Sequence, residues 1–399
     1  MFAVLTDKNA ARLFCGQLIS QVCDKMMTVG LVWVLIQRAS LEAIPWFLAA
    51  SALPHLLLAW RAGHWTTLMG PLKTVIRADW IRAAIFTGLA LTWPRVPPGA
   101  ELAVLFAASF AANLASALFN PAIMSLPLYL GEASVLQQLT ALIDSCFSFG
   151  AVLGPIFSAL LYPWAGLRGL FLINGLSYAF AAVLESGVLT SLPASAGGGD
   201  AATARAASGM GELLRGDSLL RVMLGGFLGM NLFFGPLLVF LPLFVTAAYG
   251  GTINTLASLE TSLGAGTALG GVFLSLVRFD SKAGLKISLG MLLMAFSYVG
   301  FTLTRAPWQG CACLAALGFF LATANVFILN LFQTRPEPRD VPTVMSMVNL
   351  ISTASLPVSM GVLGLLVGRV EVRRLALSCS CMLMLVTAFL VSNRELRRA

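Results

Sequence analysis

Apolar segments of membrane-spanning length recur along the whole chain and limit its fold more than any other feature of the sequence. A helix needs about 20 mostly apolar residues to cross the hydrocarbon core of a bilayer. Its backbone groups must then bond within the helix, because lipid offers them no partners. We predict an all-α integral membrane protein whose twelve transmembrane helices occupy approximately 13–37, 44–62, 75–93, 101–126, 137–162, 167–190, 219–247, 252–277, 284–304, 308–332, 342–368 and 373–393.

Composition and the placement of charge point to the same class. Hydrophobic residues make up 58% of the chain and charged residues 11%, which excludes an ordinary soluble domain. Sixteen basic residues fall in the loops and tails of one predicted side, and seven fall on the other side. Because basic loops stay in the cytoplasm, we expect both termini there. The net charge of +8 is then a topology signal and requires no nucleic-acid partner.

The acidic residues Asp24, Asp144 and Glu260 lie inside predicted spans. Ionisable groups at that depth are rare and usually functional. Burial favours the neutral form of a carboxyl group, so these acids are our candidates for proton coupling. Three alternatives to coupling stay open: Asp24 forms a neutralised internal pair, Asp144 belongs to a lipid-facing helix and reaches the surface, or Asp144 and Glu260 hydrogen-bond to nearby backbone or hydroxyl groups.

The span Gln137–Leu161 also carries a pattern for close helix packing. Gly150 and Gly154 are four residues apart and form a small-residue face that lets another helix approach. Pro155 follows and interrupts the hydrogen-bond ladder of the helix. An acid beside a close-packed, bendable seam is what a moving membrane helix needs.

Polar side chains in other predicted spans are candidates for substrate binding. Lys25 follows Asp24 directly and would attract an anionic group, while amides would supply neutral contacts. Phe, Trp and Met side chains would form an adaptable apolar wall around them. The candidates are Lys25, Asn113, Asn120, Asn231, Asn325 and Asn330.

The chain divides into two halves with six predicted spans each. Residues 191–218 are rich in Gly, Ala and Ser and predict a flexible cytoplasmic linker between bundles 1–190 and 219–399. Sliding one half by about 207–210 positions aligns polar and glycine residues of the two halves. Such duplication is typical of transporters that bind substrate near the repeat interface. The aligned pairs are Asp24 with Asn231, Asn120 with Asn330, and Gly154 with Gly361.

The segment between the second and third spans carries a recognisable pattern. It resembles the signature loop of the Major Facilitator Superfamily, in the branch that includes macrolide and enterobactin exporters. In that family the loop latches the cytoplasmic gate by charge pairing, which makes Gly63, Asp79 and Arg82 gating candidates. Thr67 stands where the family has an aspartate. The residues in register are Pro54, Ala62, Gly63, Lys73, Ala78, Asp79, Arg82 and Ala83.

Two further helices resemble the same superfamily. Gly150, Gly154 and Pro155 are similar to its fifth-helix motif, which is associated with exporters. In the family's arrangement the fifth and eighth helices meet, so the resemblance places Asp144 and Glu260 on neighbouring helices. The sixth span resembles the exporter branch through Asn174, Ser177 and Tyr178, and we expect Glu185 at its end to reach the inner interface.

The resemblance implies two pseudo-symmetric six-helix bundles that rock around a central cavity. We predict a secondary transporter, a monomer in the bacterial inner membrane, that exports an amphipathic small molecule in exchange for protons. A drug or macrolide, a siderophore and a lysophospholipid remain possible cargoes, and a lipid flippase or a siderophore importer remains an alternative activity. A receptor or scaffold and an intramembrane enzyme are the non-transport alternatives. Without a Walker-type motif or metal-ligand spacing, we expect no cofactor, no metal and no enzymatic activity.

Overall fold

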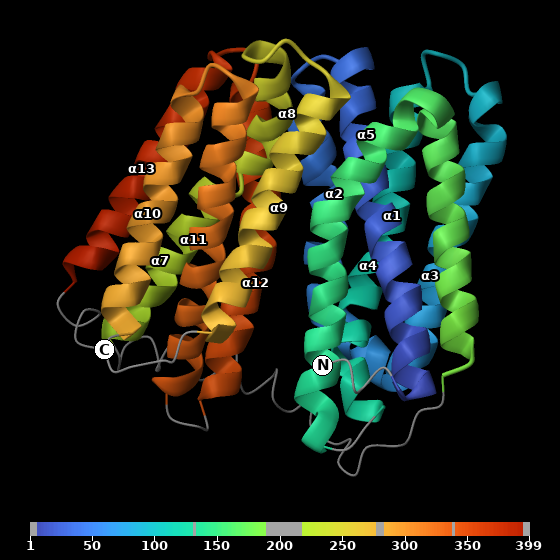
Figure 1. Cartoon of the computed structure of the whole chain (residues 1–399), viewed down its shortest axis with the longest axis horizontal. Coiled ribbons are helices and arrows are strands. Elements are labelled where there is room, and N and C mark those ends of the chain that lie inside the picture. The colour runs from blue at the N-terminus through green and yellow to red at the C-terminus, as the bar shows by residue number, and fades with distance from the viewer. Residues whose placement is uncertain (1–5, 131–132, 189–217, 277–282, 337–339, 394–399) are drawn as a thin grey trace. The chain divides into compact units, whose positions relative to one another are not determined.

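The computed structural model describes residues 6–130, 133–188, 218–276, 283–336 and 340–393 (Figure 1). Regular structure in these residues is helical, apart from one isolated bridge pairing between Val367 and Val370. The predicted all-α class is therefore confirmed.

Seven helices among the described residues are long and apolar enough to cross a membrane. The third helix of the chain carries four charged side chains and is not one of these seven. Two shorter apolar helices cover Ala43–Leu58 and Leu289–Leu303. The seven are Lys8–Arg38, Glu101–Tyr129, Leu136–Ser186, Ser218–Ala247, Pro307–Thr334, Thr343–Leu366 and Val372–Ser392.

The helices group into two compact units. Unit 1 comprises Met1–Ala39 and Ala50–Gly197, and unit 2 comprises Ser40–Ala49 and Gly198–Ala399. The start of the second helix thus groups with unit 2. The predicted linker 191–218 lies outside the described residues, apart from Ser218.

In unit 1, drawn from blue to light green in Figure 1, the first helix packs most extensively against the fifth. Spans predicted at 137–162 and 167–190 form one long element that is interrupted at Gly166. The φ angle of 58° at Gly166 suits a residue without a side chain, so the chain can change direction there. The helices are α1 (Lys8–Arg38), α2 (Ala43–Met69), α3 (Pro71–Thr92), α4 (Glu101–Ser125) and α5 (Ala133–Ser186), with short 3-10 turns η2 (Trp93–Arg95) and η3 (Leu126–Tyr129).

In unit 2, the predicted span 219–247 is broken into two helices at Gly235 and Pro236. Proline cannot donate a backbone hydrogen bond, so the helix ends and restarts there. Gly266 and Gly318 bring two other helices of this unit into close backbone contact. The helices are α7 (Ser218–Phe234), α8 (Leu237–Ala247), α9 (Ile253–Leu276), α10 (Ala283–Leu303), α11 (Pro307–Thr334), α12 (Val341–Leu366) and α13 (Val372–Ser392).

Candidate functional site

The seam between α1 and α5 brings the backbones of these two helices together. A side-chain carbon at Gly150 would lie 2.9 Å from the carbonyl oxygen of Gln21. One at Gly154 would lie 2.9 Å from the backbone nitrogen of Met26. Pro155 is buried beside them. The glycine pair therefore lies directly against the middle of α1, where Asp24 is located.

Asp24 is half-buried and is held by the second half of α5. The phenolic hydroxyl of Tyr178 donates a hydrogen bond to Oδ1 of Asp24. Tyr178 itself is fully buried, with 1% of its surface exposed. Oδ1 of the carboxylate thus accepts from a residue 154 positions later in the chain.

The ring of Tyr178 also contacts the guanidinium group of Arg82 on α3. That group lies 4.2 Å from the centre of the Tyr178 ring and 4.1 Å from the centre of the Phe119 ring on α4. Aromatic faces attract cations most strongly where water is excluded, and Arg82 is only 3% exposed. Arg82 forms an ion pair with Asp79 one helical turn earlier. Tyr178 therefore connects Asp24 to a buried ion pair.

Glu185 completes this charged cluster from the end of α5. Its side chain is fully buried, and its expected place at the inner interface stays a prediction. Gln17 on α1 donates a hydrogen bond of 2.5 Å from Nε2 to its Oε1. Glu185 and Asp79 also interact electrostatically.

Some polar atoms of the cluster remain without partners within the described residues. They include Oδ2 of Asp79, Oε2 of Glu185 and Nε of Arg82. Leaving a buried polar atom unpaired costs about 1–3 kcal/mol, and more if the group is charged. A proton on one of the two carboxyl groups would give this pair a hydrogen-bond donor. We therefore hypothesise that the Asp79–Glu185 pair shares one proton.

The other predicted residues of unit 1 lie outside this cluster. Lys25 and Asp144 are exposed, so neither forms part of the buried network. Asn113 donates 2.9 Å to the carbonyl oxygen of Ser109 in its own helix. Nδ2 of Asn120 lies 3.3 Å from Nε2 of His55 on α2. Gly63 lies in α2, and its surroundings fall outside what the structure describes.

In unit 2 the predicted polar residues are dispersed. Glu260 is half-buried on α9, and Asn231 donates 2.9 Å to the carbonyl oxygen of Phe227 in its own helix. Asn325 and Asn330 are exposed on α11. Within the described residues, no group of three or more His, Cys, Asp or Glu side chains is arranged to hold a metal ion.

Sequence reasoning misses how three of the cluster residues are used. The sequence marks Tyr178 only through its resemblance to a family pattern, predicts Glu185 at the interface, and gives no signal for Gln17. An acid inside the predicted span 167–190 is the signal that could have identified Glu185. Nothing in the sequence pairs it with Gln17, because that contact joins helices 168 positions apart.

Comparison with known proteins gives a match over most of the chain. The sequence profile of the Major Facilitator Superfamily matches residues 13–360. The uncharacterized MFS-type transporter y4rN of Sinorhizobium fredii (strain NBRC 101917 / NGR234) is 27% identical over 373 residues. That alignment covers 89% of this chain and 87% of the relative.

Solved transporter structures share the fold. A bacterial homologue of the human lysosomal transporter Spinster superposes with a TM-score of 0.71 at 13% identity, over 97% of this chain and 96% of its own. The human organic anion transporter MFSD10 gives 0.66 at 14% identity, over 96% and 99%. The fucose:proton symporter FucP of E. coli gives 0.62 at 14% identity, over 96% and 98%.

Proposed function

The chain belongs to the Major Facilitator Superfamily, and on that premise we propose that it couples proton movement to the export of an amphipathic small molecule. Members of this family are transporters and not enzymes, so the activity of this chain is secondary transport. The proposal adds the coupling ion, the direction and the class of cargo. The single observation that carries it is the buried charged cluster of unit 1.

The cluster contains more acidic than basic side chains. Asp24, Asp79 and Glu185 each interact electrostatically with one buried cation, Arg82. Ionised carboxylates deep in a membrane are costly unless each is paired. Three carboxyl groups share one arginine, so a carboxyl group without a cationic partner can bind a proton. A change in the number of bound protons would change the net charge that the surrounding helices must accommodate.

Asp24 is the member of the cluster placed to exchange protons with water. It is half-buried, whereas Asp79, Arg82, Tyr178 and Glu185 are fully buried. A change in the charge of Asp24 would alter its hydrogen bond with Tyr178, whose ring covers Arg82. Because Asp24 adjoins Lys25, whose Cβ faces Gly154, its protonation would affect how α1 and α5 pack.

The remaining elements of the proposal follow from the sequence. Both termini are cytoplasmic, the membrane is a bacterial inner membrane, and the protein works as a monomer by rocker-switch alternating access. Asp144 and Glu260 are retained as further coupling candidates. The exposed ammonium group of Lys25 favours a cargo with an anionic group, such as a siderophore or a lysophospholipid, over a purely cationic drug.

Flux into or out of proteoliposomes under an imposed pH gradient tests the proposal. The panel should include a macrolide, a siderophore and a lysophospholipid, with the gradient applied in each direction. Uphill movement of one compound that collapses with a protonophore is the expected result. Substrate movement that does not depend on the pH gradient would contradict proton coupling. Lipid scrambling between the leaflets would favour the flippase alternative.

A further inference from the structure

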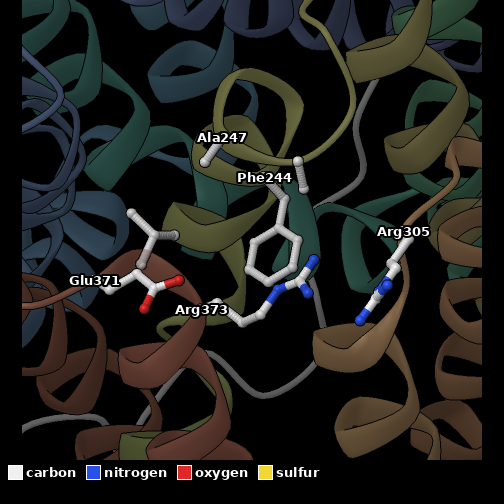
Figure 2. Close-up of a pocket in the computed structure, with 7 residues that line it drawn as sticks. Phe244, Ala247, Arg305, Glu371 and Arg373 are labelled. Atoms are coloured by element: carbon white, nitrogen blue, oxygen red, sulfur yellow. The ribbon is translucent and has the colours of Figure 1, made fainter.

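A pocket at one end of unit 2 lies outside the charged cluster and has no role in the proposed function. Its volume is about 520 Å³, within the range of small-molecule sites. It lies where the end of α8, the turn before α11 and the start of α13 come together (Figure 2). The lining residues are Phe244, Ala247, Ala248, Arg305, Glu371, Val372 and Arg373.

The arginines give this pocket its chemistry. Figure 2 shows the guanidinium groups of Arg305 and Arg373 directed toward the same space, beside the ring of Phe244. Arg373 is held in place by a hydrogen bond of 2.9 Å from Nη2 to the carbonyl oxygen of Thr304. That bond uses one of its five N–H groups, so donors remain for a ligand. Two guanidinium groups facing one space match the oxygens of a carboxylate or phosphate.

The acid in the lining does not neutralise the site. Oε2 of Glu371 lies 3.2 Å from Nε of Arg374, a residue outside the lining. In the view of Figure 2, the Glu371 carboxylate lies on the other side of the Phe244 ring from Arg305. The negative charge of Glu371 is thus directed toward a different cation.

The start of α13 adds a third feature. Glu371 is the N-cap of this 21-residue helix, and its side chain makes no capping hydrogen bond. The first N–H groups of a helix and its macrodipole favour an anion at that end. The helix begins at Val372, within the pocket lining.

We propose that this pocket binds an oxyanion group, phosphate or carboxylate, carried by an amphipathic molecule. Arg305 and Arg373 would bind the oxygens, while Ala247 and Val372 would contact the apolar part. A membrane lipid headgroup and a free organic anion share this chemistry. In the proposed orientation this end of unit 2 faces away from the cytoplasm.

Binding to the purified full-length protein in a non-ionic detergent tests the site. Hexyl phosphate and inorganic phosphate are titrated by calorimetry, and hexanol serves as the uncharged probe. Hexyl phosphate should bind more tightly than inorganic phosphate, and hexanol should not bind measurably. Absence of hexyl phosphate binding to the wild-type protein overturns the proposal.

Substitutions identify the residues. Arg305→Gln and Arg373→Gln should each weaken hexyl phosphate binding about tenfold or more, because a hydrogen bond to a charged group is lost. Arg305→Lys should retain part of the affinity. Arg95→Gln is the matched control, since Arg95 is an exposed arginine of unit 1. Equal loss in Arg95→Gln, or wild-type binding in the Arg305→Gln/Arg373→Gln double variant, contradicts the assignment.

A titration in lipid nanodiscs distinguishes a lipid headgroup from a free organic anion as the source of the oxyanion. The protein is placed in phosphatidylcholine nanodiscs with or without phosphatidic acid, and hexyl phosphate is titrated again. Competition by phosphatidic acid assigns the site to a lipid headgroup, and undiminished binding assigns it to a free anion. No proton gradient is used in these measurements, so absence of binding would not contradict the transport proposal. Absence of flux would likewise not contradict the proposed binding site.

Discussion

Tyr178 donates its phenolic hydrogen to the carboxylate of Asp24 and at the same time covers the guanidinium group of Arg82 with its ring. One side chain thus contacts the half-buried acid of α1 and the buried cation of α3. A change in the charge of Asp24 would alter the hydroxyl bond first and the packing on Arg82 next. This relationship would connect the proposed proton binding at Asp24 to helix packing.

Asp24→Asn should abolish gradient-driven flux while leaving the protein folded. Asparagine has nearly the same shape and still accepts a bond from Tyr178, but it cannot take up and release a proton. Flux under a pH gradient and the thermal unfolding midpoint in detergent are measured together. Asp7→Asn is the control, because Asp7 caps α1 from an exposed position and asparagine also caps helices well. Wild-type flux in Asp24→Asn would remove this residue from the coupling mechanism.

Tyr178→Phe should slow proton-driven flux with only a modest change in stability. The ring that covers Arg82 remains, and the loss of one hydrogen bond to a charged group costs about 1.5–3 kcal/mol. Tyr162→Phe is a matched control on the same helix, since its exposed hydroxyl bonds to Gln37 at 3.0 Å. If both variants transport equally well, the bond to Asp24 has no part in coupling.

Glu185→Gln and Asp79→Asn should affect stability very differently. Glutamine keeps an oxygen for Gln17 and adds an N–H donor toward Asp79, so it imitates a protonated Glu185. Asparagine at position 79 removes the direct ion-pair partner of the buried Arg82, and breaking a buried pair costs about 3–5 kcal/mol. The thermal unfolding midpoint should stay near wild type in the first variant and fall clearly in the second. Equal destabilisation of both would mean that the pair holds no shared proton.

The close-packing face of Gly150 and Gly154 could be predicted from the sequence, whereas its partner helix and the charged cluster could not. Gly150 and Gly154 are four residues apart, and helical periodicity alone places them on one face. Which helix they meet, and that Glu185 meets Gln17 there, depends on the rotation of each helix within the bundle. Apolar length sets the depth of a residue in the membrane but carries no information about that rotation. The break at Gly166 is likewise visible in the sequence only as a gap between two predicted spans.

Gly154→Ala should destabilise the protein through the seam. The added carbon would lie 2.9 Å from the backbone nitrogen of Met26 and 3.0 Å from the carbonyl oxygen of Val22, and backbone atoms cannot move aside cheaply. Overpacking of this kind costs roughly 1–3 kcal/mol. Gly88→Ala on α3 is the control, because no heavy atom lies within 4 Å of the added carbon. Alanine there should stabilise the helix by about 1 kcal/mol, so the two variants should shift the thermal midpoint in opposite directions.

Asp144→Asn and Glu260→Gln should separate the remaining coupling candidates from the cluster. Asp144 is exposed on α5 and belongs to unit 1, while Glu260 is half-buried on α9 in unit 2. Because Asp144 has no place in the buried network, its neutralisation should leave the thermal midpoint unchanged. If the cluster is the sole proton site, both variants keep gradient-driven flux while Asp24→Asn loses it. If one of them also loses flux without loss of stability, protons bind at a second position, and the ratio of protons to substrate measured from the reversal potential should fall in that variant.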